Sequence, residues 1–100
     1  MSYIVLDLEW NQAMSSNASV FNRLPIHLSG EIIQIGAVKL DDDFCPAEEF
    51  QSDVRPIYFR SMHYKVKKLT GIDKERLSHG DTFPTVFEHF REWCGEDPVF

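Results

Sequence analysis

The stretch YIVLDLEW, residues 3–10, decides the fold. Its first four residues are continuously apolar, which is typical of an interior strand in a sheet covered on both faces. Asp7 and Glu9 follow at a spacing of two, so strand alternation points both acids to the same face. The opposite face, which we expect to pack against a helical layer, carries Ile4, Leu6, Leu8 and Trp10.

Two carboxylates side by side on an apolar strand indicate a site for a divalent metal ion. Asp7 and Glu9 repel one another, and the desolvation of both charges is costly. A bound Mg²⁺ or Mn²⁺ removes that cost, and these ions prefer oxygen ligands. The alternative is an exposed strand end with two solvated acids, and D-x-E alone is too short to decide. A two-carboxylate glycosidase is disfavoured, because acids on one face are too close to flank a glycosidic bond.

The remaining sequence predicts a mixed α/β sheet in which a three-stranded antiparallel meander is followed by helices. The segment EIIQIGAVKL, Glu31–Leu40, predicts a second strand after a long polar loop over residues 11–30. A third strand is expected over residues 49–54. Helices are expected over residues 61–69, 73–78 and 82–94, and another strand is expected to begin at residue 98. Because the chain stops there, we expect residues 1–100 to be the N-terminal part of a single, longer domain.

The last expected helix is strongly amphipathic. Pro84 is tolerated in its first turn, and Gly95 is expected to end it. One apolar stripe, expected to face the core, is formed at helical spacing by Phe83, Val86, Phe87, Phe90 and Cys94.

Composition describes an ordinary globular protein, with 43% hydrophobic and 26% charged residues. No apolar run approaches the length of a membrane span, and the N-terminus has no signal-peptide pattern, so we expect a cytoplasmic protein that binds no membrane. Cys45 and Cys94 lack CxxC spacing and are expected to be isolated thiols. The net charge of −6 argues against nonspecific coating of DNA.

The positive charge is concentrated in one stretch of the chain, which holds Arg55, Arg60, Lys65, Lys67, Lys68, Lys74 and Arg76. Aromatic residues are interleaved with these cations, as is common where single-stranded nucleic acid is held by stacking and phosphate contacts. Tyr64, Lys65 and Lys68 are therefore weak candidates for nucleic-acid contacts. A solvated basic helix is the alternative.

Taken together, YIVLDLEW, the segment IIQIGAV at residues 32–38 and the Thr-Gly-Ile turn at 70–72 resemble the DnaQ-like (DEDD) family of 3′–5′ exonucleases, which has the ribonuclease H-like fold. The resemblance covers essentially the whole chain. It implies that Asp7 and Glu9 are the family's first motif, with Asp7 contacting two Mg²⁺ or Mn²⁺ ions and Glu9 one of them. The implied partner is the 3′ end of single-stranded DNA or RNA, and the implied product is a nucleoside 5′-monophosphate.

The chain departs from the family pattern after Glu9, where Trp10, Asn11 and Gln12 replace the frequent Thr-Thr-Gly. We still expect Leu8, Trp10 and Asn11, which flank the acids, to contact nucleic acid. The resemblance also implies two further Asp residues and a His or Tyr general base, and we expect these after residue 100. Residues 1–100 alone are therefore expected to show little or no catalysis, and incomplete cover of the sheet is expected to favour self-association.

Three points stay open at the level of sequence. An inactive, nuclease-derived binding or interaction module is the alternative to the enzyme. Gly36 either allows close approach of backbone and nucleotide or simply gives packing room. Gln34 is either a polar neighbour of the site or a satisfied buried amide.

Overall fold

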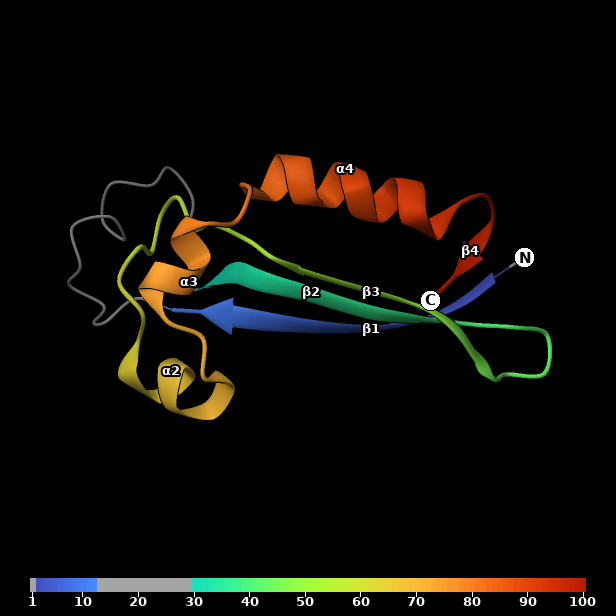
Figure 1. The fold of residues 1–100 in the computed structure, drawn as a ribbon, viewed down its shortest axis with the longest axis horizontal. Helices are drawn as coiled ribbons and strands as arrows, with labels where there is room; N and C mark the ends of the chain where they lie inside the picture. Colours follow the sequence, from blue (N-terminus) through green and yellow to red (C-terminus); the bar gives the residue numbers. More distant parts are fainter. Residues whose placement is uncertain (1, 13–29) are drawn as a thin grey trace.

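The computed structural model describes residues 2–12 and 30–100, so most of the expected loop at residues 11–30 lies outside the described residues. The described residues contain a four-stranded sheet in the order β3-β2-β1-β4 (Figure 1). Its strands are β1 (Ser2–Asn11), β2 (Glu31–Leu40), β3 (Pro46–Asp53) and β4 (Pro98–Val99). β1 pairs antiparallel with β2, and β2 with β3, whereas β4 pairs parallel with β1. The expected meander and the mixed sheet are confirmed.

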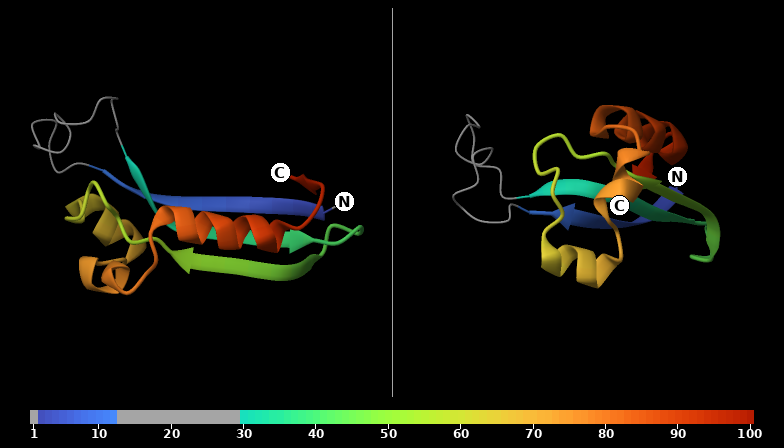
Figure 2. Two further views of the ribbon diagram at one scale, coloured as in Figure 1. Left: turned by 90° about the horizontal axis from the view of Figure 1, so that it is seen from above. Right: turned by 60° about the vertical axis from the view of Figure 1, so that its left-hand side comes forward.

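Three helices follow the meander, as the sequence predicts: α2 (Tyr64–Thr70), α3 (Lys74–Ser78) and α4 (Phe83–Cys94). Helix α4 runs along the strands on one face of the sheet, and α2 and α3 lie at the end toward which β1 runs (Figures 1 and 2). None of these helices is long and apolar enough to cross a membrane.

Two expected boundaries are wrong. Strand β3 begins at Pro46 rather than at residue 49, because it pairs with β2 almost to the turn. Helix α2 begins at Tyr64 rather than at residue 61, because His63 is extended and its ring nitrogen Nδ1 caps the helix by accepting from the Lys65 amide.

The main core lies between α4 and the sheet. Val86, Phe90 and Cys94 of α4 pack against buried residues of β1 and β2, against the partly buried Phe50 of β3 and against Val54 just after β3. The buried strand residues of this cluster are Ile4, Ile35 and Ala37. The face of β1 that carries Ile4 and Leu8 is therefore the face toward α4, as strand alternation predicts.

The expected helix contacts of several apolar residues are not made. Leu6 and Trp10 are 42% and 50% exposed, because α4 lies above β2, between β1 and β3, and leaves much of β1 uncovered (Figure 2). Phe83 and Phe87 are also exposed and stack on each other, with ring centroids 5.5 Å apart. Only part of the apolar stripe of α4 therefore packs against the sheet.

A second core cluster fixes the Thr-Gly-Ile turn at residues 70–72. The Thr70 hydroxyl donates to the Val66 carbonyl and accepts from the Ile72 amide, while Gly71 ends α2 at a φ of 72°. Ile72 is thereby placed in a buried cluster with Ile33 and Leu77. The turn is a helix C-cap whose third residue ties α2 and α3 to the sheet.

Both cysteines are free thiols, as expected. Cys45 is exposed, near the turn between β2 and β3, whereas Cys94 is buried under α4. Burial raises the pKa of the Cys94 thiol, because the thiolate is the form that loses hydration.

Candidate metal centre

Asp7 and Glu9 lie on the face of the sheet opposite to α4. In the β1–β2 register Asp7 pairs with Gly36 and Glu9 with Gln34. Residues two apart on a strand are separated by about 6.6 Å along its axis, so the two carboxylates can converge on a shared ligand. Asp7 is exposed and Glu9 is half-buried. Within the described part of the chain, neither acid forms an ion pair.

The surface beside Asp7 is open. A shallow hollow of about 310 Å³ is lined by Val5, Asp7, Gly36, Ala37, Val38, Glu49, Phe50 and Gln51. A Cβ atom on Gly36 would lie 3.6 Å from the Asp7 carbonyl oxygen, which is an ordinary contact. Gly36 is therefore not required by close packing of the strands; it leaves the surface next to Asp7 free of a side chain.

A row of hydrogen-bonded side chains begins at Gln34, beside Glu9, and continues across the sheet. Gln34, the neighbour of Glu9, donates through Nε2 to Asp53 Oδ1 at 3.2 Å. Arg76 of α3 donates to both oxygens of Asp53, at 2.7 and 3.0 Å. These hydrogen bonds and the Asp53 charge raise the pKa of the Arg76 guanidinium. Gln34 is thus both a neighbour of the site and a partner of Asp53, whose oxygens are already engaged.

A β-bulge lies directly after Glu9. The register shifts between Glu9 and Trp10, so that Ile33 is the extra residue on β2. Ile33 is fully buried against Ile72 and Leu77. Bulges re-aim neighbouring side chains, and this one also anchors the α2–α3 corner beside the end of β1 that carries the acids.

Asn11 supports the segment that precedes α2. It is 0% exposed, and its Nδ2 donates to the carbonyls of Phe59 and Ser61 at 2.8 and 3.1 Å. Its Oδ1 accepts from the His63 amide at 3.0 Å. The side chain is fully occupied by backbone groups, so we leave Asn11 out of the surface proposed to contact nucleic acid.

Glu31, the partner of Asn11 across β1 and β2, organises the same segment from the other side. Its carboxylate accepts from the amides of Ile57, Tyr58 and Phe59 at 2.8–3.2 Å. Sequence reasoning missed both roles. The available signal in the sequence was a polar residue at the end of β1 and another at the start of β2, next to a segment with no regular structure of its own.

The other expected contact residues fall into two groups. Leu8 packs against the core under α4, whereas Trp10 is half-exposed on that same side. Tyr64, Lys65 and Lys68 are exposed on α2, where the Tyr64 ring stacks on His63. The structure does not gather these six residues, Asn11 included, into one surface.

The two acids fit a divalent metal ion by the chemistry of their donors, but only as a partial ligand set. Carboxylate oxygens on an open face suit Mg²⁺ or Mn²⁺, which keep several water ligands. In the described ranges no group of three His, Cys, Asp or Glu residues is placed to hold a metal. Asp7 and Glu9 would therefore need further ligands from water, substrate or other residues.

The fold agrees with comparisons to known proteins. A model of the RNase T family, described as exonuclease, matches residues 4–100. The chain belongs to this exonuclease family. No curated protein matches the chain significantly.

Solved structures of exonucleases share this fold. The nuclease domain of 3′hExo, a DEDDh family member bound to rAMP, superposes with a TM-score of 0.73 and is 24% identical. Cell-death related nuclease 4 (CRN-4) gives a TM-score of 0.71, also at 24% identity. Each match covers 93% of this chain but only 43% and 29% of the respective neighbour. The chain therefore spans less than half the length of these exonucleases, and its ribonuclease H-like fold is confirmed.

Proposed function

We propose that the protein is a metal-dependent exonuclease that removes nucleotides from the 3′ end of DNA or RNA. One observation carries the proposal: two carboxylates share an open face of the sheet, within a fold and a sequence family of exonucleases. Exonucleases of the DEDD type use divalent metal ions, and oxygen ligands on an open surface meet the requirements of such ions.

Asp7 and Glu9 are the residues proposed to hold the metal. When bound, Mg²⁺ or Mn²⁺ supplies charge neutralisation at the phosphodiester and lowers the pKa of a bound water. The chain's own contribution is geometric. Pairing of β1 with β2 fixes the spacing of the two acids, and the bulge after Glu9 fixes the orientation of the strand end.

The proposed site also includes ligands beyond these two acids. Because no group of three potential ligands is gathered among the described residues, two carboxylates would hold a metal only loosely, so residues 1–100 alone are proposed to have little catalysis. Two more Asp residues and a His or Tyr base, following residue 100 in a longer natural chain, would complete the site. The exposed apolar residues of the sheet and of α4 support the further proposal that the isolated residues 1–100 self-associate.

The experiment uses the full-length natural protein and a single-stranded oligonucleotide labelled at its 5′ end. With Mg²⁺ or Mn²⁺ we expect a ladder of products that shorten from the 3′ end, with release of nucleoside 5′-monophosphates. EDTA should stop the reaction, and a substrate blocked at its 3′ end should resist it. Internal cleavage fragments, or hydrolysis that persists in EDTA, would contradict the proposal. Binding without any hydrolysis would favour an inactive binding module.

A further inference from the structure

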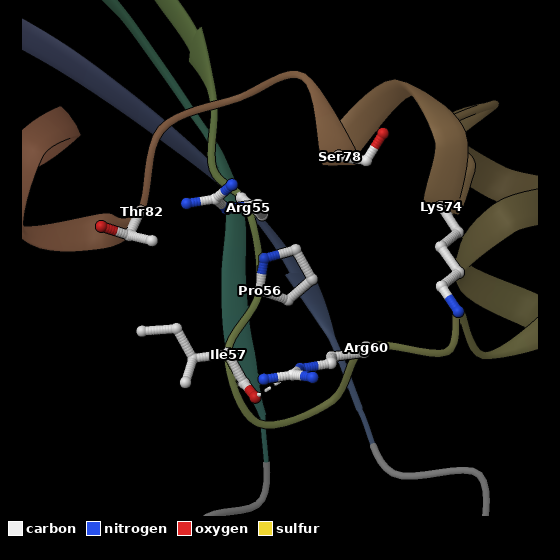
Figure 3. A pocket seen from close by; sticks show the side chains of 7 residues that line it. All are labelled: Arg55, Pro56, Ile57, Arg60, Lys74, Ser78 and Thr82. Carbon is white, nitrogen blue, oxygen red and sulfur yellow. Dashed lines mark hydrogen bonds between the residues drawn. The ribbon is translucent and has the colours of Figure 1, made fainter.

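A basic hollow lies between α3, the start of α4 and the segment after β3 (Figure 3). It has a volume of about 410 Å³ and is lined by Arg55, Pro56, Ile57, Arg60, Lys74, Ser78 and Thr82. In Figure 3 the three cationic side chains surround Pro56, and no carboxylate lines the hollow. These cations belong to the basic stretch of the sequence, but they are not the ones on α2.

Among the described residues, Arg55, Arg60 and Lys74 form no ion pair. The ion pairs of the described residues join Lys39 to Glu48, Arg76 to Asp53 and Arg91 to Glu88. Residues 13–29, which the structure does not describe, contain no Asp or Glu. Of the seven cations in the basic stretch, Arg76 is neutralised by Asp53. Arg55, Arg60 and Lys74 are left to concentrate positive charge around one hollow.

The start of α4 adds to the preference for an anion. Thr82 precedes the helix and lines the hollow, and its side chain makes no capping hydrogen bond. The first turn of α4 contains no acidic residue. The positive end of the helix dipole therefore favours an anionic ligand there, with the Thr82 hydroxyl available as a donor.

The wall of the hollow is held in place before any ligand binds. The Glu31 carboxylate fixes the amides of Ile57 and Tyr58, and the Arg55 amide donates to the Asp81 carbonyl at 2.8 Å. The Arg60 side chain donates through Nε to the Ile57 carbonyl at 3.2 Å. This arrangement reduces the ordering cost of binding.

Ile57 also lines a second, apolar hollow of about 330 Å³, whose other lining residues are Trp10, Gly30, Glu31, Ile32, Tyr58, Phe83 and Pro84. The rings of Trp10, Tyr58 and Phe83 are all more than one third exposed. Cations beside exposed aromatic rings are the combination by which single-stranded nucleic acid is held, through its phosphates and its bases. A free phosphate ion or an acidic peptide would use the cations alone.

We propose that the hollow of Arg55, Arg60 and Lys74 binds the phosphodiester backbone of a single-stranded nucleic acid, at nucleotides upstream of the end held at Asp7 and Glu9. The identity of the ligand rests on the proposed nuclease function, whereas the binding step does not require hydrolysis. Helix α3 and the start of α4, which line the hollow, lie toward the end of the sheet at which β1 finishes (Figure 1), and Glu9 is two residues from the end of β1. Because the acids face away from α4, a strand anchored in the hollow reaches them by passing around the end of β1.

The test measures binding of a fluorescently labelled 12-nucleotide single strand to the full-length protein in EDTA, by anisotropy, from 0.1 to 1 M salt. The variants are Arg55→Gln, Lys74→Gln and the double variant. Lys74 makes no hydrogen bond or ion pair with other described side chains, so its variant keeps the fold even if Arg55→Gln does not. Arg91→Gln, an equal charge change on α4 outside the hollow, is the matched control.

Each lost phosphate contact should reduce the slope of log affinity against log salt by about 0.7, and the double variant should lose about 1.4. The ratio of wild-type affinity to single-variant affinity should then be about fivefold larger at 0.1 M salt than at 1 M salt. Unchanged slopes, or equal losses in Arg91→Gln, would overturn the proposal. Displacement of the oligonucleotide by millimolar inorganic phosphate would also overturn it, in favour of a free-phosphate site. If the protein hydrolyses the strand but the hollow variants bind it normally, only the binding proposal is refuted. If the hollow variants bind it more weakly but the wild type does not hydrolyse it, only the proposed exonuclease function is refuted.

Discussion

Replacement of Asn11 by alanine removes three hydrogen bonds that hold residues 59–63 against the end of β1. The bonds to the Phe59 carbonyl and the His63 amide are buried, whereas the bond to the Ser61 carbonyl is only partly buried and water can replace it. A buried backbone group left without a partner costs about 1–3 kcal/mol. The two shielded groups therefore predict that the variant loses about 2–6 kcal/mol of unfolding free energy.

Urea denaturation measures this loss as a shift of the unfolding midpoint at an unchanged slope. The exposed neighbour provides the control, because Gln12→Ala should change the unfolding free energy by less than about 0.5 kcal/mol. Hydrogen exchange supplies a local readout, since the His63 amide should lose its protection in the Asn11 variant. A loss below about 0.5 kcal/mol, or an unchanged exchange rate at His63, would refute the reasoning.

Two further predictions concern the core. Ile33→Ala should cost about 2–5 kcal/mol of unfolding free energy, because Ile33 is fully buried between the sheet and the α2–α3 corner. The control, Ile57→Ala at an exposed position, should cost less than about 1 kcal/mol. Equal effects of the two substitutions in urea denaturation would argue against the second core cluster. Cys45 should react with a thiol reagent at least about tenfold faster than Cys94, because Cys94 is buried and its thiol pKa is raised. Equal alkylation of both cysteines at neutral pH would contradict the buried placement of Cys94. The same raised pKa makes stability depend on pH: the neutral Cys94 thiol stabilises the fold below the ordinary thiol pKa, and this contribution is lost as pH rises through the raised folded-state pKa.

The sequence was informative wherever one local rule decides the structure. The apolar run and alternation of residues 3–10 predicted β1 and placed Asp7 and Glu9 on one face. The expected helices at 73–78 and 82–94 and the expected stop at Gly95 likewise lie within a few residues of the observed helix ends. Each of these features depends on neighbours that are close in the chain.

The features that the sequence did not predict depend on contacts between distant residues. Asn11 and Phe59 are 48 positions apart, and no periodicity signals that an amide will satisfy that carbonyl. Alternation placed Leu6 toward the helical layer, but it could not say that α4 lies above β2 and leaves Leu6 exposed. The charge cluster was visible in the sequence, yet only the fold separates the cations of the basic hollow from those on α2 and from the paired Arg76.

The central claim is that Asp7 and Glu9 are metal ligands of a nuclease. Its most direct test is the Mn²⁺-dependent hydrolysis of a single strand by the full-length protein carrying Asp7→Asn or Glu9→Gln, with Asp43→Asn in the exposed turn as the control. Loss of one carboxylate ligand should lower the rate at least about 100-fold, because each contact stabilises charge where the bond breaks. Both site variants should keep the unfolding midpoint of the wild type, since neither acid is fully buried. Hydrolysis within about twofold of wild type in Asp7→Asn would contradict the account.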